Sequence, residues 1–502
     1  MPFTDVAAAL QTLRALEAKT HAYSHALGVL GHDAATAAPK GAFAGRGKTM
    51  GILSEVIYHL ETDPEVGELL TFLESNRDQL EPAVQREVAL VRKNYDQTCR
   101  IPPEEYVAYG VLLNEAQAVW EKAKKENDFD AFAPYLEKIV DYNRRFAAYR
   151  NPDLAPYDAL LNEYEEGLNT RILDAFFAQL RQAIVPLVSR IQATKQIDDS
   201  FLHKTYPVAG QRAVSNYIMD VMGIDRQYCG LAESEHPYTT GFNTKDVRIT
   251  THYYLQDVAA SLYSVIHEGG HAIYEMNIGP EYEGTAVGHA VSMGIHESQS
   301  RFFENIIGRS RPFIHYIFPK LVEIFPEQLA GVDADQFWQA VNKAEPSLVR
   351  TEADELTYSL HIMVRYELEK QLIAGTLAAR DVPAAWNRLY KEYLGIDVPN
   401  DTQGCLQDSH WSGGSIGYFP SYALGSAYGP QMLLCMERDL PDLWQHVAQG
   451  DLSQVKGWLQ SHIHRHGSLY QPSKLFEMAC GPFDAKHYTD YLTKKYTELY
   501  HL

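Results

Sequence analysis

Apolar residues recur at every third or fourth position through most of the N-terminal half of the chain, with charged residues between them. This spacing places apolar side chains on one face of a helix. It predicts helices within 50–62, 106–127 and 172–194. Proline-containing segments at 102–105 and 151–158 follow breaks in the pattern and are typical of helix starts. The N-terminal half is therefore expected to be helical.

Alternating, β-branched sequence is scarce, and the best candidate strand is TKDVRITTHYY at 244–254. A glycine-rich run at 413–425 is expected to be a loop that leads into a helix, and the helical pattern resumes from about residue 429. The pattern predicts a mainly α fold with one small β-element. Because no compositional break divides residues 1–502, we expect a single unit with two helical lobes around a groove.

Composition narrows the possible partners. The chain has 44 basic and 65 acidic residues and a net charge of −21, which repels nucleic acid and anionic membranes. Its five cysteines are odd in number and form no CxxC motif, so a disulfide framework and a cysteine-zinc site are not expected. The N-terminus lacks signal-peptide features, and no apolar stretch is long enough for a membrane span. These features predict a cytoplasmic protein.

The segment SVIHEGGHAIYEM at 264–276 carries the strongest chemical signal. On a helix that begins near Asp257, His267 and His271 stack on one face and can bind one metal ion. Glu268 is offset by one position, where a base can act on metal-bound water. Two glycines follow Glu268 although glycine disfavours helix, so we expect another backbone or the substrate to approach closely there.

A catalytic metal of this kind usually has three protein ligands and an open position. The helical segment GIHESQSRFFENIIG at 294–308 offers Glu297 as the best third ligand, with His296 and Glu304 as rivals. Arg301 lies four residues beyond Glu297 and is expected to hold its carboxylate.

Six motifs occur in a fixed order, and together they resemble the carboxypeptidase Taq family of metallocarboxypeptidases. The family shows HPF, DxRxT, HExxH, HES(M/Q)S, I(R/A)xxAD and GxxQDxHW elements. They correspond here to 236–238, 246–250, 267–271, 296–300, 349–354 and 404–411, and DAATAAPKGA at 33–42 also resembles the family. The chain departs from the pattern at Tyr238 in place of Phe, at Val349 in place of Ile, and at His32, where Trp is expected.

The resemblance implies properties that the residue spacing does not show. The fold should be a helical metallopeptidase fold with a deep groove, related to the neurolysin-like oligopeptidases, with the site motifs within 236–425. The reaction should be removal of C-terminal residues from peptides that have a free C-terminus, with broad specificity and poor release around proline. The protein should be a homodimer that contains zinc or sometimes cobalt. Manganese is a further possible ion, because sites with nitrogen and oxygen ligands accept several divalent metals.

The chemistry can be assigned to named residues. The metal is expected on His267, His271 and Glu297, with Glu268 as the general base for the water nucleophile. Tyr422, Tyr418 and His410 are candidate donors to the tetrahedral oxyanion, with Tyr422 preferred. Asp408 or Asp354 is expected to accept the N–H of a ligand histidine.

Exopeptidase action also requires recognition of the terminal carboxylate, for which a guanidinium is well suited. Arg350 is the first candidate and Arg248 the second, and His236 is expected near the same end of the substrate. Arg248 has a structural alternative, an ion pair with Asp246, Glu352 or Asp354.

Three other functions compete with this interpretation. An endo-oligopeptidase would share the metal, the base and the water, and would differ only in ignoring the terminal carboxylate. A helical binding protein with an accidental HExxH would hold no metal and hydrolyse nothing. An aminopeptidase is the third alternative, although no GxMEN-type element is evident in the sequence.

Overall fold

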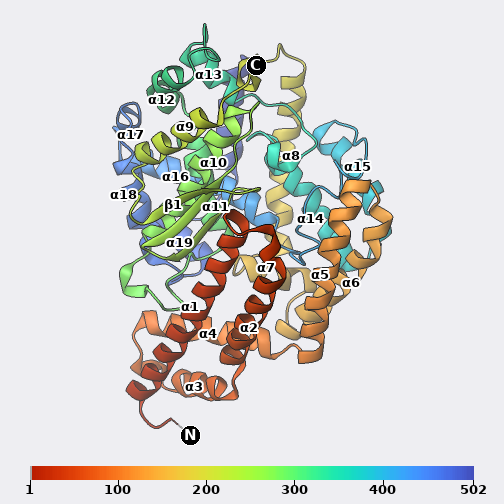
Figure 1. The fold of residues 1–502 in the computed structure, drawn as a ribbon, viewed down its shortest axis with the longest axis vertical. Coiled ribbons are helices and arrows are strands. Elements are labelled where there is room, and N and C mark those ends of the chain that lie inside the picture. The colour runs from red at the N-terminus through yellow and green to blue at the C-terminus, as the bar shows by residue number, and fades with distance from the viewer. Residues whose placement is uncertain (1–2) are drawn as a thin grey trace.

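The computed structural model describes residues 3–502, and these residues form mostly α-helices with one small β-sheet (Figure 1). The mainly α prediction is therefore confirmed. The helices predicted within 50–62, 106–127 and 172–194 are all present. All five cysteines are free, as their spacing predicts.

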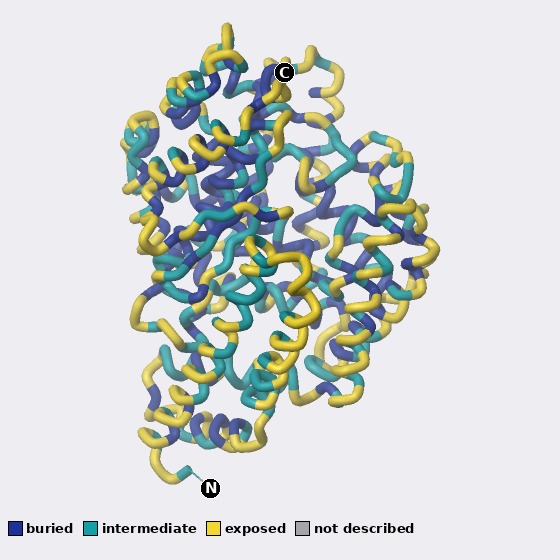
Figure 2. Tube along the Cα trace, viewed as in Figure 1, coloured by how far each residue is buried: buried dark blue, intermediate teal, exposed yellow. Residues whose placement is uncertain are grey.

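Four N-terminal helices form the lower part of the molecule in Figure 1. They are α1 (Val6–Thr36), α2 (Phe43–Thr62), α3 (Pro64–Ser75) and α4 (Pro82–Cys99). The apolar faces of α1, α3 and α4 meet in a small cluster of their own, made of Ala9, Leu13, Val66, Leu69, Leu70, Leu73, Leu80 and Val88. Much of their remaining surface is exposed or half-buried (Figure 2).

Five helices connect this layer to the sheet. They are α5 (Pro103–Glu126), α6 (Phe129–Arg150), α7 (Pro156–Tyr164), α8 (Thr170–Gln192) and α9 (Val208–Val221). Pro103 and Pro156 each occupy the first position of their helix, which confirms the predicted starts. Proline suits this position because a residue there has no helical partner for its backbone N–H.

Helix α8 is apolar and long enough to pass a length and composition test for a membrane span. Its apolar face, with Phe176, Leu180 and Ile184, is buried in the main core. Core helices pass the same test, and α8 packs as one of them.

The remaining helices surround the main core, and two of them carry the HExxH motif and the motif at 296–300. They are α10 (Val258–Met276), α11 (Met293–Arg301), α12 (Arg311–Ile324), α13 (Ala334–Val341), α14 (Tyr358–Ala374), α15 (Val382–Leu394), α16 (Pro420–Asp439), α17 (Leu443–Val447), α18 (Ser453–His462), α19 (Pro472–Cys480) and α20 (Lys486–Tyr500). The glycine-rich run predicted as a loop at 413–425 does lead into a helix, but the helix, α16, already begins at Pro420.

The sheet has three short strands, β1 (Cys229–Glu233), β2 (Thr239–Asn243) and β3 (Asp246–Thr251), in the order β1-β3-β2. Strand β3 is the predicted one, and it pairs with β1 in parallel and with β2 in antiparallel orientation. The other two strands were not predicted, because CGLAE and TTGFN lack the alternation that marks a strand. The sheet packs against α10, so it lies beside the HExxH helix.

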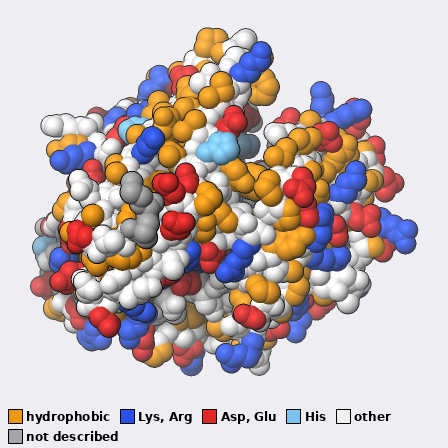
Figure 3. Space-filling model, turned by 90° about the horizontal axis from the view of Figure 1, so that it is seen from below, with side chains coloured by type: hydrophobic (Ala, Val, Ile, Leu, Met, Phe, Trp, Pro, Cys, Tyr) orange, Lys and Arg blue, Asp and Glu red, His pale blue; other side chains and the backbone are white. Residues whose placement is uncertain are grey.

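The molecule is hollowed between two masses when it is seen from below, and a histidine side chain lies at the rim of the hollow (Figure 3). The depth of a substrate groove, the neurolysin-like relationship and the organisation of 1–502 as a single two-lobed unit stay predictions.

Candidate active site

Helix α10 carries the HExxH motif through the centre of the fold. It begins where the sequence predicts, because the Asp257 carboxylate caps it by accepting a hydrogen bond from the Ala260 N–H at 3.0 Å. Most of its side chains are buried, including Val265, Ile266 and Ile273. The motif is therefore held in a rigid, packed helix rather than on the surface.

Close packing explains the two glycines of the motif. A Cβ atom at Gly270 would lie 2.7 Å from the backbone oxygen of Gln299 and 2.7 Å from the Cα of Ser300. A Cβ at Gly269 would lie 2.8 Å from the end of the Met222 side chain. The predicted backbone approach at these glycines is confirmed at Gly270, where α11 lies directly against α10.

Helix α11 carries Glu297, and a third helix fixes it from the other side. A Cβ at Gly425 of α16 would lie 2.5 Å from Cγ of Glu297 and 2.6 Å from its Cβ. Glycines on α10 and α16 therefore let both helices approach the segment that holds Glu297. The Ser292 hydroxyl caps α11 by accepting from the Ile295 N–H at 3.1 Å.

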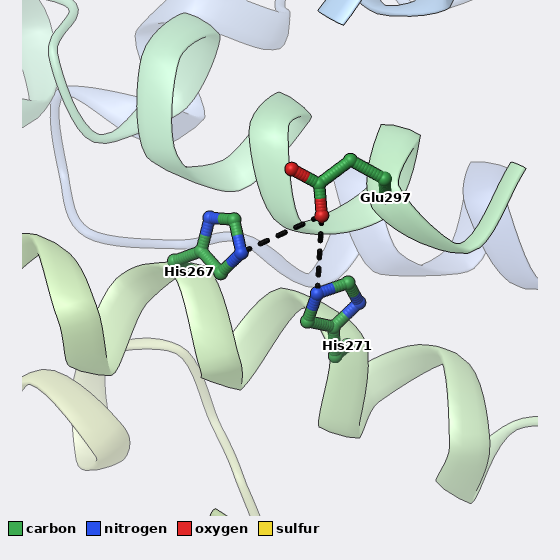
Figure 4. A group of neighbouring side chains, drawn as sticks. All are labelled: His267, His271 and Glu297. Carbon is green, nitrogen blue, oxygen red and sulfur yellow. Dashed lines mark ion pairs between the residues drawn. The ribbon is translucent and has the colours of Figure 1, made fainter. Parts of the chain in front are cut away.

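His267, His271 and Glu297 point toward one another from α10 and α11 (Figure 4). Oε2 of Glu297 lies 3.6 Å from Nε2 of His267 and 3.5 Å from Nε2 of His271. Two ligand atoms that are each about 2.1 Å from one tetrahedral ion lie about 3.4 Å apart. The nitrogen and oxygen donors and their spacing therefore fit a divalent metal such as zinc.

Glu304 orients the first histidine of this cluster. Its Oε2 lies 2.8 Å from Nδ1 of His267, which leaves Nε2 facing Glu297. Burial opposes ionisation of Glu304, but Arg301 and His267 outweigh it and lower the pKa of this carboxyl. Glu304 therefore lies behind His267, outside the group of three that could hold a metal, in the position of a carboxylate that orients a histidine.

This arrangement corrects the prediction that Asp408 or Asp354 accepts the N–H of a ligand histidine. Asp408 is instead bonded to Arg350 and Arg365, and Asp354 accepts the backbone N–H groups of Leu356 and Thr357. Which carboxylate faces a histidine depends on helix packing, which the motifs alone do not reveal.

Arg301 was expected to hold Glu297, and His296 was a rival to Glu297 as the third ligand. The structure gives Arg301 the expected partner but gives His296 a different one. Arg301 Nε donates to Oε1 of Glu297 at 2.7 Å, which confirms the expected contact. His296 pairs with Glu275 at 2.9 Å and stacks on His271 with ring centroids 4.2 Å apart. Its Nε2 is thus engaged away from the three-residue cluster.

The helix after α11 is not regular, although the sequence predicts a continuous helix over 294–308. Residues Phe302–Ile307 form a π-helical turn that contains Glu304. Such turns are rare and are frequent at functional sites. The periodicity of apolar residues gives no signal for a single turn of this kind.

Glu268 lies beside the cluster and is buried. Thr239 Oγ1 on β2 donates to Oε2 of Glu268 at 2.6 Å. Burial raises the pKa of Glu268, while His267 and this hydrogen bond act against the rise. Thr239 was not predicted, because its link to the base depends on how β2 packs against α10.

Arg350 belongs to a buried charge network. Its Nε and Nη2 donate to Oδ1 of Asp408 at 3.0 and 2.8 Å, and its Nη1 donates to the Tyr358 hydroxyl at 3.1 Å. Arg365 donates to the other oxygen of Asp408 at 2.7 Å. The two arginines thus share one aspartate, and the side chain of Arg350 has an exposed fraction of 7%.

The three candidate oxyanion donors form one aromatic group. His410 Nε2 lies 3.2 Å from the Tyr422 hydroxyl, and the rings of Tyr418 and Tyr422 are edge-on with centroids 5.0 Å apart. The Arg350 guanidinium lies 5.0 Å from the centroid of the Tyr422 ring. Tyr422 is one helical turn from Gly425, which contacts Glu297. The group therefore joins the Arg350 network to the metal-site helix.

The remaining candidates lie at the sheet. Arg248 on β3 forms two hydrogen bonds of 2.9 Å with Asp246, so its predicted structural alternative is the arrangement found. His236 is an exposed residue between β1 and β2, and its carbonyl accepts a hydrogen bond from Ser234.

A HExxH helix that faces a glutamate on a neighbouring helix, within a mostly helical fold, defines a metallopeptidase. The family model for the carboxypeptidase Taq (M32) metallopeptidases matches residues 12–496 of this chain. The chain belongs to this family, and it is a metallocarboxypeptidase.

Curated relatives and solved structures agree with this assignment. Carboxypeptidase 1 of Bacillus subtilis is 40% identical over 480 residues, which cover 95% of this chain and 96% of that protein. Thermostable carboxypeptidase 1 of Thermus thermophilus is 38% identical over 508 residues, covering 98% and 99%. The crystal structure of an M32 carboxypeptidase from Deinococcus radiodurans matches with a TM-score of 0.96 at 36% identity, covering 99% and 100% of the two chains.

Proposed function

We propose that this metallocarboxypeptidase releases residues one at a time from the free C-terminus of peptides, with broad side-chain tolerance. The ion is held by His267, His271 and Glu297, and zinc is the first candidate, with cobalt or manganese as alternatives. The observation that carries the proposal is the three-residue cluster with the buried carboxylate of Glu268 beside it.

When it is bound, the metal supplies a Lewis acid that lowers the pKa of a coordinated water toward neutrality. Glu268 accepts a proton from the attacking water and delivers it to the leaving amine. Thr239 holds one oxygen of Glu268, so the other oxygen is oriented for this proton transfer. Burial lowers the pKa of His271 to about 3, which keeps this imidazole in the neutral form that a ligand requires.

Tyr422, Tyr418 and His410 are proposed to face the carbonyl oxygen as negative charge develops on it. Burial raises the pKa of both tyrosines, so their hydroxyls stay protonated and can donate hydrogen bonds. Burial lowers the pKa of His410 to about 4, so its ring is neutral near pH 7. Tyr422 is preferred because it lies between Arg350 and the helix turn that contacts Glu297.

Arg350 is the proposed partner of the substrate carboxylate, with Arg248 and His236 as alternatives. The Asp408 carboxylate and the Tyr358 hydroxyl fix the Arg350 guanidinium in one orientation. A fixed guanidinium loses little freedom when it binds a carboxylate through two hydrogen bonds. Arg248 is held by Asp246 on the sheet.

The remaining parts of the proposal concern the cellular location, the partners and the oligomeric state of the enzyme. The acidic balance of the chain and its free cysteines support a cytoplasmic location without nucleic-acid or membrane partners. The homodimer rests on the family resemblance alone.

An endo-oligopeptidase on the same fold is the second candidate, because it would use the same metal and base. One peptide in two forms, with a free C-terminal acid and with a C-terminal amide, separates the two functions by mass spectrometry. The proposal predicts stepwise trimming of the acid, an intact amide, and no cleavage in the presence of a chelator. Internal cuts in both forms would support the endo-oligopeptidase instead.

A further inference from the structure

A fully buried glutamate outside the proposed machinery binds the segment that carries the candidate oxyanion donors. Glu369 lies on α14, and three groups donate hydrogen bonds to its carboxylate. The Trp411 indole N–H donates to Oε1 at 2.8 Å, and the Gly417 backbone N–H donates to Oε2 at 2.8 Å. The Tyr157 hydroxyl, from α7, donates to Oε2 at 2.9 Å.

Two of these donors lie at the two ends of one short segment, 411–417. Each end is bound to a different oxygen of the same carboxylate, so Glu369 bridges the two ends of the segment. We call these two hydrogen bonds the staple. The backbone at Gly417 has a φ of 92°, which only glycine adopts freely, and a Cβ there would lie 3.0 Å from the Leu160 carbonyl carbon. The segment is therefore tightly folded against α7.

The residues on either side of segment 411–417 are two of the candidate donors to the oxyanion. His410 precedes Trp411, and Tyr418 follows Gly417. The His410 ring lies 5.6 Å from the Tyr418 ring between centroids, and His410 Nε2 contacts the hydroxyl of Tyr422. A shift at either end of the segment would therefore displace this aromatic group.

A carboxylate suits this position better than any uncharged side chain of the same shape. It offers two accepting oxygens, whereas a glutamine amide offers one oxygen and one NH₂ group. In either orientation, the amide would leave the N–H of Trp411 or of Gly417 facing another donor. Burial raises the pKa of Glu369 to about 7, and the hydrogen bond from Trp411 acts against this rise. The fold therefore places a carboxyl group here although burying its charged form is unfavourable.

We propose that Glu369 is a positioning residue, which fixes segment 411–417 and through it the placement of His410, Tyr418 and Tyr422. This inference rests on the proposed role of those three residues in stabilising the transition state. Asp408 and Tyr358, which fix Arg350, both lie outside segment 411–417, so loss of the staple should impair the chemical step more than substrate binding.

The test compares two variants that each disrupt one hydrogen bond at the side chain of residue 369. Glu369→Gln breaks a bond at one end of the segment, whereas Tyr157→Phe removes a donor that comes from α7. We expect Glu369→Gln to lower kcat about 10- to 100-fold, as small misplacements of catalytic groups do, with KM changed less than about twofold. Tyr157→Phe should keep kcat within about twofold of the wild type. Metal content is measured for both.

Coupling to Tyr422 separates positioning from a general loss of stability. If Glu369 acts through the aromatic group, its substitution should cost less in a Tyr422→Phe background than in the wild type. Fully multiplicative effects on kcat, or equal kcat values for Glu369→Gln and Tyr157→Phe, would overturn the positioning role.

A second variant covers the case in which Glu369→Gln does not fold. Trp411→Phe removes the indole N–H at one end of the staple and keeps Glu369, and it should reproduce the selective fall in kcat. Unchanged kcat in Trp411→Phe would overturn the inference. A metal-loaded wild type that leaves the free-acid peptide intact would overturn the proposed function itself, which distinguishes the two failures.

Discussion

The hydroxyl of Tyr238 lies 2.8 Å from Nδ1 of His32, so two of the three departures from the family pattern contact each other. Tyr238 replaces a phenylalanine before β2, and His32 replaces a tryptophan on α1. Burial lowers the pKa of His32, so Nδ1 of its neutral ring can accept a hydrogen bond from the Tyr238 hydroxyl. The two substitutions together join α1 to the start of the strand that carries Thr239.

This contact predicts a coupled loss of stability. Tyr238→Phe should lower the free energy of unfolding by about 1 kcal/mol, the typical net worth of one hydrogen bond. In a His32→Ala background, the same substitution should cost clearly less. Denaturant unfolding of the four proteins gives both values. Tyr228→Phe, at an exposed tyrosine, is the control and should change stability by less than about 0.5 kcal/mol.

Glu304 is predicted to tune the metal site without binding the ion. Glu304→Gln should weaken metal affinity about 10- to 100-fold, because the carboxylate that orients His267 is lost. Competition with a chelator measures this affinity. Glu275→Gln is the matched control, since its carboxylate pairs with His296, and it should keep the affinity of the wild type. Equal affinities for both variants would contradict the role of Glu304.

Arg350 is predicted to discriminate acids from amides. Arg350→Ala should raise KM for a free-acid peptide about 10- to 100-fold, as expected when a charge-assisted hydrogen-bond pair is lost. Asp408 keeps a partner in Arg365, so it is not left as an unpaired buried charge. Steady-state kinetics on matched acid and amide peptides test this. An unchanged KM in this variant, with a raised KM in Arg248→Ala, would move the role to Arg248.

The buried carboxyl group of Glu165 should make the stability of the protein depend on pH. This carboxyl is buried, and it accepts the Gly294 N–H at the start of α11 at 3.0 Å. Burial raises its pKa from 4.5 to about 7, so the native state favours the protonated form. The stability that Glu165 contributes is complete below about pH 4.5 and is lost as pH rises through 7.

Glu165→Gln should remove this dependence, because an amide accepts the Gly294 N–H at every pH. Between pH 5 and 7, the Tm of the metal-loaded wild type should fall relative to that of Glu165→Gln, and the difference should level off above pH 7. Two parallel curves of Tm against pH would show that Glu165 does not titrate in this range.

Local patterns were sufficient to predict much of the fold and the central cluster. Apolar periodicity reports burial directly, and two histidines four residues apart on a helix must share a face, so α5, α8 and α10 could be predicted. The contact of Arg301 with Glu297 follows from the same helical spacing.

Contacts between distant segments could not be predicted in this way. Glu304 reaches His267 only because α10 and α11 lie against each other and the helix continues as a π-turn. His32 and Tyr238 are 206 positions apart, and Glu369 binds its segment from another helix. Strands β1 and β2 are short and irregular, and their pairing with β3 depends on the packed fold.

The most direct test of the account is to measure metal content and turnover in one sample of Glu268→Gln. The metal ligands and their orienting partners are untouched, so the variant should bind one equivalent of metal, as the wild type does. Only the proton transfer is lost, and kcat should fall about 10²- to 10⁴-fold. A fully metal-loaded Glu268→Gln that turns over at nearly the wild-type rate would contradict the assignment of Glu268 as the base beside the metal.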